Sequence, residues 1–84
     1  MIRVLENQTF TNGADFANAL NKARLANKQR WIVYTGTVAG KRVELKTFDT
    51  GDLQIYRVDG IDHGGGMDLK VGEWKRRIEA PFSR

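Results

Sequence analysis

Apolar and polar residues alternate between positions 30 and 61, and this pattern predicts an antiparallel sheet. Val, Ile, Tyr, Thr and Trp alternate there with polar residues, and the pairs Ala39-Gly40 and Thr50-Gly51 interrupt the alternation. Glycine-containing pairs between alternating runs are typical of tight turns. We therefore expect a three-stranded meander over residues 30–61, joined by two two-residue turns.

Counting outward from these two turns gives an expected register. It places Tyr34 opposite Leu45, and Leu45 opposite Tyr56. Because successive side chains point to opposite faces, one face should carry most of the apolar residues. These are Ile32, Tyr34, Val43, Leu45, Tyr56 and Val58. We expect this face to form the core.

The opposite face should combine paired charges with an aromatic end. Arg42 falls beside Asp59, and Glu44 falls beside Arg57. Each such pair contributes only about 0.2–1 kcal/mol, but it disfavours a wrong register. The same counting gathers an apolar group around Lys46, made up of Trp31, Val33, Phe48, Leu53 and Ile55.

The second turn leaves an alternative open. Thr50-Gly51 is not a preferred pair for a two-residue hairpin. A loop of Asp49, Thr50 and Gly51 with a β-bulge would instead shift the last strand by one residue.

A helix is expected before the meander, over about residues 13–27. Its apolar residues recur at helical spacing and include Phe16, Ala19, Leu20, Ala23 and Ala26. Thr11 or Asn12 can cap its start, and Asn27 can end it. Ile2 and Val4 suggest a short first strand.

The last quarter of the chain is less regular. Residues 62–66 are predicted to form a mobile connector because they include three consecutive glycines. In the tail, Trp74 and Ile78 fit a helix, whereas Met67, Leu69 and Val71 alternate as in a strand. The sequence therefore predicts a single small α+β domain over residues 1–84. It should have a mostly antiparallel sheet of about four to five strands, one helix on one face, and a short C-terminal strand or helix.

Composition narrows the possible functions. The 84 residues contain no cysteine and carry a net charge of +4. Disulfides and thiolate metal sites are therefore excluded. No apolar run reaches the length of a membrane span, so we expect no membrane association and a cytoplasmic location.

No catalytic or cofactor-binding pattern stands out. His63 is the single histidine, so no second imidazole can complete a metal site. The run Gly64-Gly65-Gly66 lacks the spacing of a phosphate-binding loop. We expect a protein that is not an enzyme and needs no cofactor or metal.

Two kinds of partner remain. The first hypothesis is a protein partner or self-association, in the style of the small inhibitors and adaptors that phages and plasmids direct at host machinery. Its interface would consist of Trp31, Phe48, Leu53, Arg42, Lys46 and Arg57. The alternative is nucleic acid, bound by Trp31, Lys41, Lys46, Lys75, Arg76 and Arg77. A third possibility is that the tail itself covers the apolar patch.

The expected order of elements, helix, three strands and helix, is similar to that of double-stranded RNA-binding domains. The likeness concerns element order alone, and no residue role follows from it.

Overall fold

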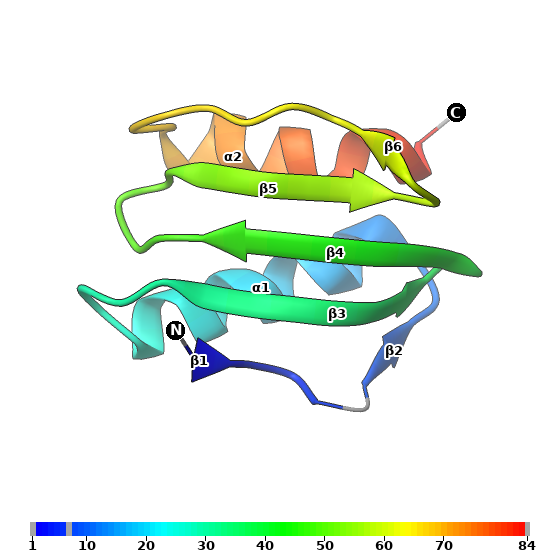
Figure 1. Ribbon diagram of the computed structural model, residues 1–84, viewed down its shortest axis with the longest axis horizontal. Helices are drawn as coiled ribbons and strands as arrows, with labels where there is room; N and C mark the ends of the chain where they lie inside the picture. The colour runs from blue at the N-terminus through cyan, green and yellow to red at the C-terminus, as the bar shows by residue number, and fades with distance from the viewer. Residues whose placement is uncertain (1, 7, 84) are drawn as a thin grey trace.

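A six-stranded sheet with both helices behind it makes up the protein (Figure 1). The computed structural model describes residues 2–6 and 8–83. The strands are β1 (Ile2–Arg3), β2 (Thr9–Phe10), β3 (Ile32–Val38), β4 (Lys41–Thr47), β5 (Leu53–Val58) and β6 (Ile61–Asp62). The helices are α1 (Gly13–Ala26), α2 (Val71–Glu79) and a 3₁₀ turn, η1 (Ala80–Phe82). The expected α+β fold is confirmed.

The central strands β3, β4 and β5 form the antiparallel meander, and short segments cover its two edges. β1 and β2 pair with β3 in parallel, and β6 pairs with β5. Short strands along an edge protect it from pairing with other chains. The expected first strand is confirmed at β1, whereas β2 gave no signal in the sequence.

The first hairpin has the register that the sequence predicted. Tyr34 lies opposite Leu45, and Val38 lies opposite Lys41. Ala39 and Gly40 form the two-residue turn with φ of 50° and 79°. Positive φ at both positions gives the turn that matches the twist of the flanking strands.

The second hairpin differs from the expected one at its turn. Residues 49–51 form a three-residue loop, closed by a bond from the Phe48 amide to the Asp52 carbonyl at 2.9 Å. Gly51 has φ of 101°, and the carbonyl oxygen of Leu69 lies where a Cβ would stand, so only glycine fits. The predicted two-residue turn at Thr50-Gly51 is therefore wrong, and the alternative loop of Asp49, Thr50 and Gly51 with a bulge is the one observed.

A bulge restores the register after this loop. Thr47 pairs with Leu53 and Lys46 pairs with Ile55, which leaves Gln54 as an extra residue. The longer loop and the bulge shift the strand by one residue each, in opposite directions. They cancel, and the expected pairing of Glu44 with Arg57 is confirmed.

Leu53 lies on the other face from the one we expected. Leu53 follows the three-residue loop but precedes the bulge, so only the shift caused by the loop applies to it. Leu53 therefore lies opposite Thr47 and points to the same face as Thr47. Its side chain is 2% exposed and belongs to the core. Its predicted position beside Trp31 and Phe48 on the far face is wrong.

Asp59 and Gly60 form a third tight turn instead of extending β5. Their φ angles are 52° and 79°, and β6 follows directly. Asp59 is still next to Arg42, but its carboxylate accepts from the Arg42 backbone N–H at 2.9 Å. The proximity of Asp59 to Arg42 was predicted correctly, although Asp59 bonds to the Arg42 backbone and not to its side chain.

Helix α1 begins where the capping pattern indicated. The Asn12 side chain accepts from the Asp15 backbone N–H at 2.8 Å, and Asn27 ends the helix. Phe16, Ala17 and Leu20 are fully buried against the sheet.

The tail forms helix α2, and no strand precedes it over residues 67–70. Trp74 and Ile78 are both fully buried. The Trp74 indole donates to Thr47 Oγ1 at 3.1 Å, and the Tyr56 hydroxyl donates to the Ile78 carbonyl at 2.5 Å. Thr47 and Tyr56 face the core, so α2 lies beside α1 on the same side of the sheet.

The glycine-rich segment is held along the sheet edge. Leu53 and Gly66 exchange backbone hydrogen bonds at 2.7 and 3.1 Å. Arg77 donates from Nη1 to the Gly65 carbonyl at 2.7 Å. This segment therefore extends the cover over β5 that β6 begins.

Thr47→Val should destabilise the fold by about 2 kcal/mol, because it leaves the buried Trp74 indole N–H without a partner and removes one of the two hydrogen bonds to the Asp52 carbonyl. Thr47 Oγ1 accepts from Trp74 and donates to the Asp52 carbonyl at 2.6 Å. Urea denaturation measures the change. The exposed Thr35→Val should change stability by no more than about 0.5 kcal/mol. Equal losses in the two variants would contradict the role of Thr47.

Candidate functional site

One face of the sheet has no layer packed on it within residues 2–6 and 8–83, because both helices lie on the other side (Figure 1). We call it the open face. Its side chains come from alternate positions of the central strands and from β1. They are Arg3, Trp31, Val33, Thr35, Thr37, Arg42, Glu44, Lys46, Phe48, Ile55 and Arg57.

Aromatic and aliphatic side chains occupy one end of the open face. The rings of Trp31 and Phe48 are tilted, with centroids 5.1 Å apart. Lys46 Nζ lies 5.2 Å from the Trp31 ring centroid, which is within cation–π range. Val33 is partly exposed, and Ile55 is 36% exposed. Four apolar side chains therefore reach solvent together around one lysine.

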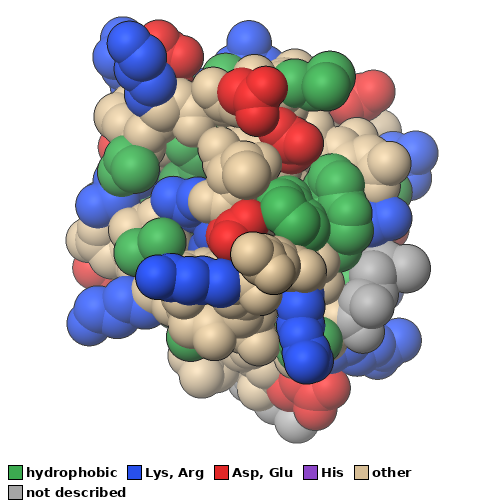
Figure 2. Space-filling model, turned by 90° about the vertical axis from the view of Figure 1, so that its left-hand side faces the viewer, with side chains coloured by type: hydrophobic (Ala, Val, Ile, Leu, Met, Phe, Trp, Pro, Cys, Tyr) green, Lys and Arg blue, Asp and Glu red, His purple; other side chains and the backbone are tan. Residues whose placement is uncertain are grey.

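A hollow of about 280 Å³ lies beside Trp31. Asp52, Leu53, Gln54, Gly66 and Met67 complete its lining. Met67 is 79% exposed. Figure 2 looks at this end of the sheet and shows hydrophobic side chains gathered next to acidic ones. The apolar end of the open face thus continues into a concave surface.

The other half of the open face is charged. Arg57 Nη1 lies 3.4 Å from Glu44 Oε2, and the two side chains are 53% and 51% exposed. This is the one ion pair in the part of the chain that the structure describes. At such exposure it contributes little stability, about 0–1 kcal/mol.

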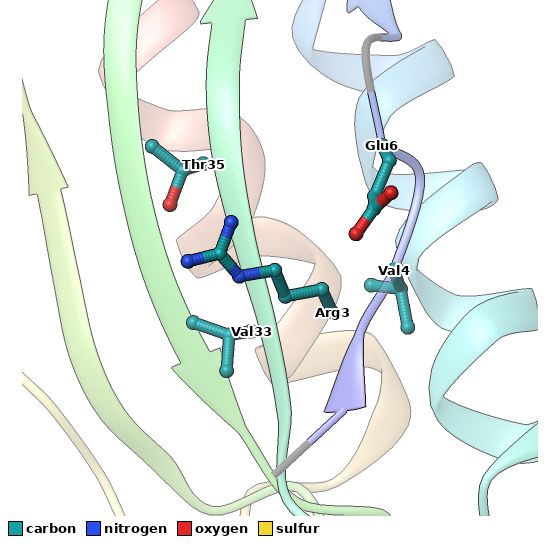
Figure 3. A pocket seen from close by; sticks show the side chains of 5 residues that line it. All are labelled: Arg3, Val4, Glu6, Val33 and Thr35. Atoms are coloured by element: carbon teal, nitrogen blue, oxygen red, sulfur yellow. The ribbon is translucent and has the colours of Figure 1, made fainter.

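Arg3 adds a cation that the sequence gave no reason to select. β1 runs parallel to β3 with Arg3 beside Val33. Figure 3 shows the Arg3 side chain crossing β3 towards Val33 and Thr35, with Glu6 facing the same hollow. The hollow measures about 190 Å³. A two-residue strand carries too little pattern to reveal its partner, so neither Arg3 nor Glu6 could be assigned in advance.

Of the six residues predicted to bind nucleic acid, only Trp31 and Lys46 lie on the open face. Lys75, Arg76 and Arg77 belong to α2, which packs behind the sheet. Lys75 Nζ donates to Asn18 Oδ1 at 3.2 Å, and Lys41 Nζ donates to the Pro81 carbonyl at 3.1 Å. The six residues therefore do not form one continuous surface.

Of the six residues predicted as a protein interface, five share the open face. Trp31 and Phe48 lie at its apolar end, together with Lys46. Arg42 and Arg57 lie in its charged half. Leu53 is the exception, since it is buried below the hollow. Ile55 takes its place as the exposed aliphatic residue of β5.

Arg24 is a buried cation with a structural role. It is 3% exposed, and its guanidinium stacks 4.9 Å from the Trp74 ring centroid. It donates to Asn21 Oδ1 at 2.8 Å and to the Asp49 carbonyl. Burial lowers the pKa of Arg24, and the nearby Asp49 charge partly offsets this. Arg24 therefore ties α1 to α2 and to the β4–β5 loop, whereas the sequence suggested only a helix-end cation.

Outside the open face, chemistry-bearing residues remain scattered. His63 is exposed, with its ring 5.9 Å from that of Tyr56. No three His, Asp or Glu side chains come together as a metal site among the residues described. Neither helix in that part of the chain is long and apolar enough to cross a membrane.

No family model, curated protein or solved structure matches the chain.

Trp31→Ala should leave the protein folded with a loss of about 1–2 kcal/mol, because Trp31 is partly exposed and loses mainly its contact with Phe48. Trp74→Ala should cost about 3–5 kcal/mol, because Trp74 is fully buried. Urea denaturation compares them. If Trp31→Ala unfolds the protein as readily as Trp74→Ala, Trp31 belongs to the core and the open face is wrongly assigned.

Proposed function

We propose that this protein is a non-enzymatic binding module that contacts another protein through the open face. One observation carries the proposal. Both helices cover the same side of the sheet, which leaves Trp31, Val33, Phe48 and Ile55 accessible together on the other side. Contiguous exposed apolar side chains with polar neighbours are typical of protein interaction sites.

The chemistry of the apolar end favours a protein partner over nucleic acid. Base stacking needs a free aromatic face. Around Trp31, Lys46 lies over the ring and Phe48 packs against it at a tilt. Val33 and Ile55 add aliphatic surface, which suits the apolar side chains of another protein better than bases.

The charged half supports the same interpretation. Glu44 lies between Arg42, Lys46 and Arg57, so a negative group interrupts the positive charge of this half. Mixed charges around an apolar centre orient a protein partner more than they add affinity. A phosphate backbone would instead favour a continuous positive surface.

The sheet supplies a rigid base for such a site. Its side chains are fixed by paired strands and by a core beneath them, so little order has to be gained on binding. A small module of this kind suits an inhibitor or adaptor that acts by covering a surface of its target.

Photo-crosslinking tests the proposal directly. A photoreactive amino acid at position 55 should form an adduct with a partner protein, because this position lies in the apolar end. The same amino acid at position 76, on α2, should not form it. The partner is then purified and its affinity measured by calorimetry.

Matched variants complete this test. Ile55→Lys should weaken the purified partner's binding at least about tenfold, because it places a charge among the apolar side chains of the interface. Val71→Lys, at a residue 50% exposed on α2, should leave binding unchanged. Adducts from position 76 alone, or equal effects of the two substitutions, would refute the proposal.

Titration with a single-stranded oligonucleotide tests the alternative ligand. We expect only weak, non-specific affinity, with a Kd of about 10⁻⁴–10⁻⁶ M at physiological salt. Trp31→Ala should not change it, because the ring is not a free stacking surface. A steep salt dependence together with at least about tenfold weaker binding by Trp31→Ala would favour nucleic acid as the natural ligand.

A further inference from the structure

We infer that the open face binds a second copy of this chain, face to face, about a two-fold axis that crosses β4 above Leu45. The inference rests on the proposed function, since it names the partner of the same surface. Three features support it: the order of charges along β4, the residues at the apolar end of the open face, and the size of that face.

The charge order along β4 is complementary to itself. Glu44 and Lys46 flank Leu45, and both point to the open face, because Leu45 points to the core. A two-fold axis perpendicular to β4 at Leu45 reverses the direction of the strand in the second copy. Glu44 then lies over Lys46 of the second copy, and Lys46 lies over its Glu44. Two opposite-charge contacts form from one pair of residues.

The same rotation matches the ends of β4. It places Arg42 over Phe48 of the second copy, and Phe48 over its Arg42. A guanidinium over an aromatic ring is favourable, and more so when water is excluded. On the neighbouring strand it places Trp31 near Thr37, and Val33 near Thr35. On β5 it places Ile55 over Arg57 of the second copy, so the four apolar residues of this end meet threonine or arginine side chains.

The charges also exclude a two-fold axis that runs along β4 itself. Such an axis keeps each residue of β4 at its own level along the strand. It would place Glu44 over Glu44 of the second copy and Lys46 over its Lys46. Like charges opposed across an interface are strongly unfavourable. Of these two axes through β4, only the perpendicular one is compatible with its charges.

The face is large enough for a stable pair. The molecule measures 30 × 24 Å in the plane of the sheet, and 20 Å across it (Figure 1). This outline sets an upper limit of roughly 700 Å² on the area that one copy can bury, and a standard interface buries ~600–1,000 Å² on each partner. Two twisted sheets packed at about −30° keep their central strands in contact, where the Glu44 and Lys46 contacts lie.

Charge exchange at two exposed positions tests this arrangement. Sedimentation velocity should show the wild-type chain as a dimer. Glu44→Lys and Lys46→Glu should each raise the dimer Kd at least about tenfold, because each places like charges together twice. The variant that carries both substitutions should dimerise again, because a lysine at position 44 then meets a glutamate at position 46 of the second copy.

Mixing the two single variants gives the sharpest result. The Glu44→Lys variant has lysine at positions 44 and 46, and the Lys46→Glu variant has glutamate at both. The two variants should form a heterodimer when mixed, although each alone is monomeric. Glu73→Lys and Lys70→Glu, which make the same charge changes beside or on α2, are matched controls and should remain dimeric. Circular dichroism checks the fold, which should persist because the Glu44–Arg57 pair is exposed.

Three results would overturn the inference. The first is a wild-type chain that stays monomeric at about 1 mM, where even a millimolar interface would be substantially populated. The second is a dimer that both single variants retain. The third is a mixture of the two single variants that stays monomeric. If the chain is monomeric but position 55 still crosslinks to a different protein, the proposed function stands and only the choice of partner fails.

Discussion

The pairing of β4 with β5 is the constraint on which the other features depend. A three-residue loop shifts the strand by one residue, and the extra residue Gln54 shifts it back. Between these two points Leu53 enters the core, and beyond them Ile55 reaches the open face. Because side chains alternate along a strand, a slip of one residue would exchange the core and the open face. The register of β4 and β5 therefore determines both the core and the residues of the open face.

The position of α2 follows from the core face of the same strands. Thr47 binds the Trp74 indole and Tyr56 binds the end of α2, while Arg24 of α1 stacks on Trp74. These contacts hold both helices on one side of the sheet. They also leave the Trp31 side of the sheet without a helix. An exposed sheet face results, because both helices pack against the other side.

The sequence predicted the features that depend on local pattern. Alternation located the meander, the capping of α1 by Asn12 was visible, and Ala39-Gly40 set the register of the first hairpin. The errors arose where long-range contacts decide. Leu53 was misplaced because its side depends on the three-residue loop and on the bulge at Gln54, and its backbone pairs with the distant Gly66. Arg3 reaches the open face only through parallel pairing of a two-residue strand. Arg24 resembles an ordinary helix-end cation until Trp74 packs beside it.

The central claim is the β4–β5 pairing, and proton NMR tests it most directly. Residues directly opposite in an antiparallel pair bring their Hα atoms close together at alternate positions. We predict cross-strand Hα–Hα contacts between Leu45 and Tyr56 and between Thr47 and Leu53. A contact between Thr47 and Gln54 in place of the second would mean that the bulge is absent and that Leu53 faces the open side. That result would contradict both the core and the site described for this protein.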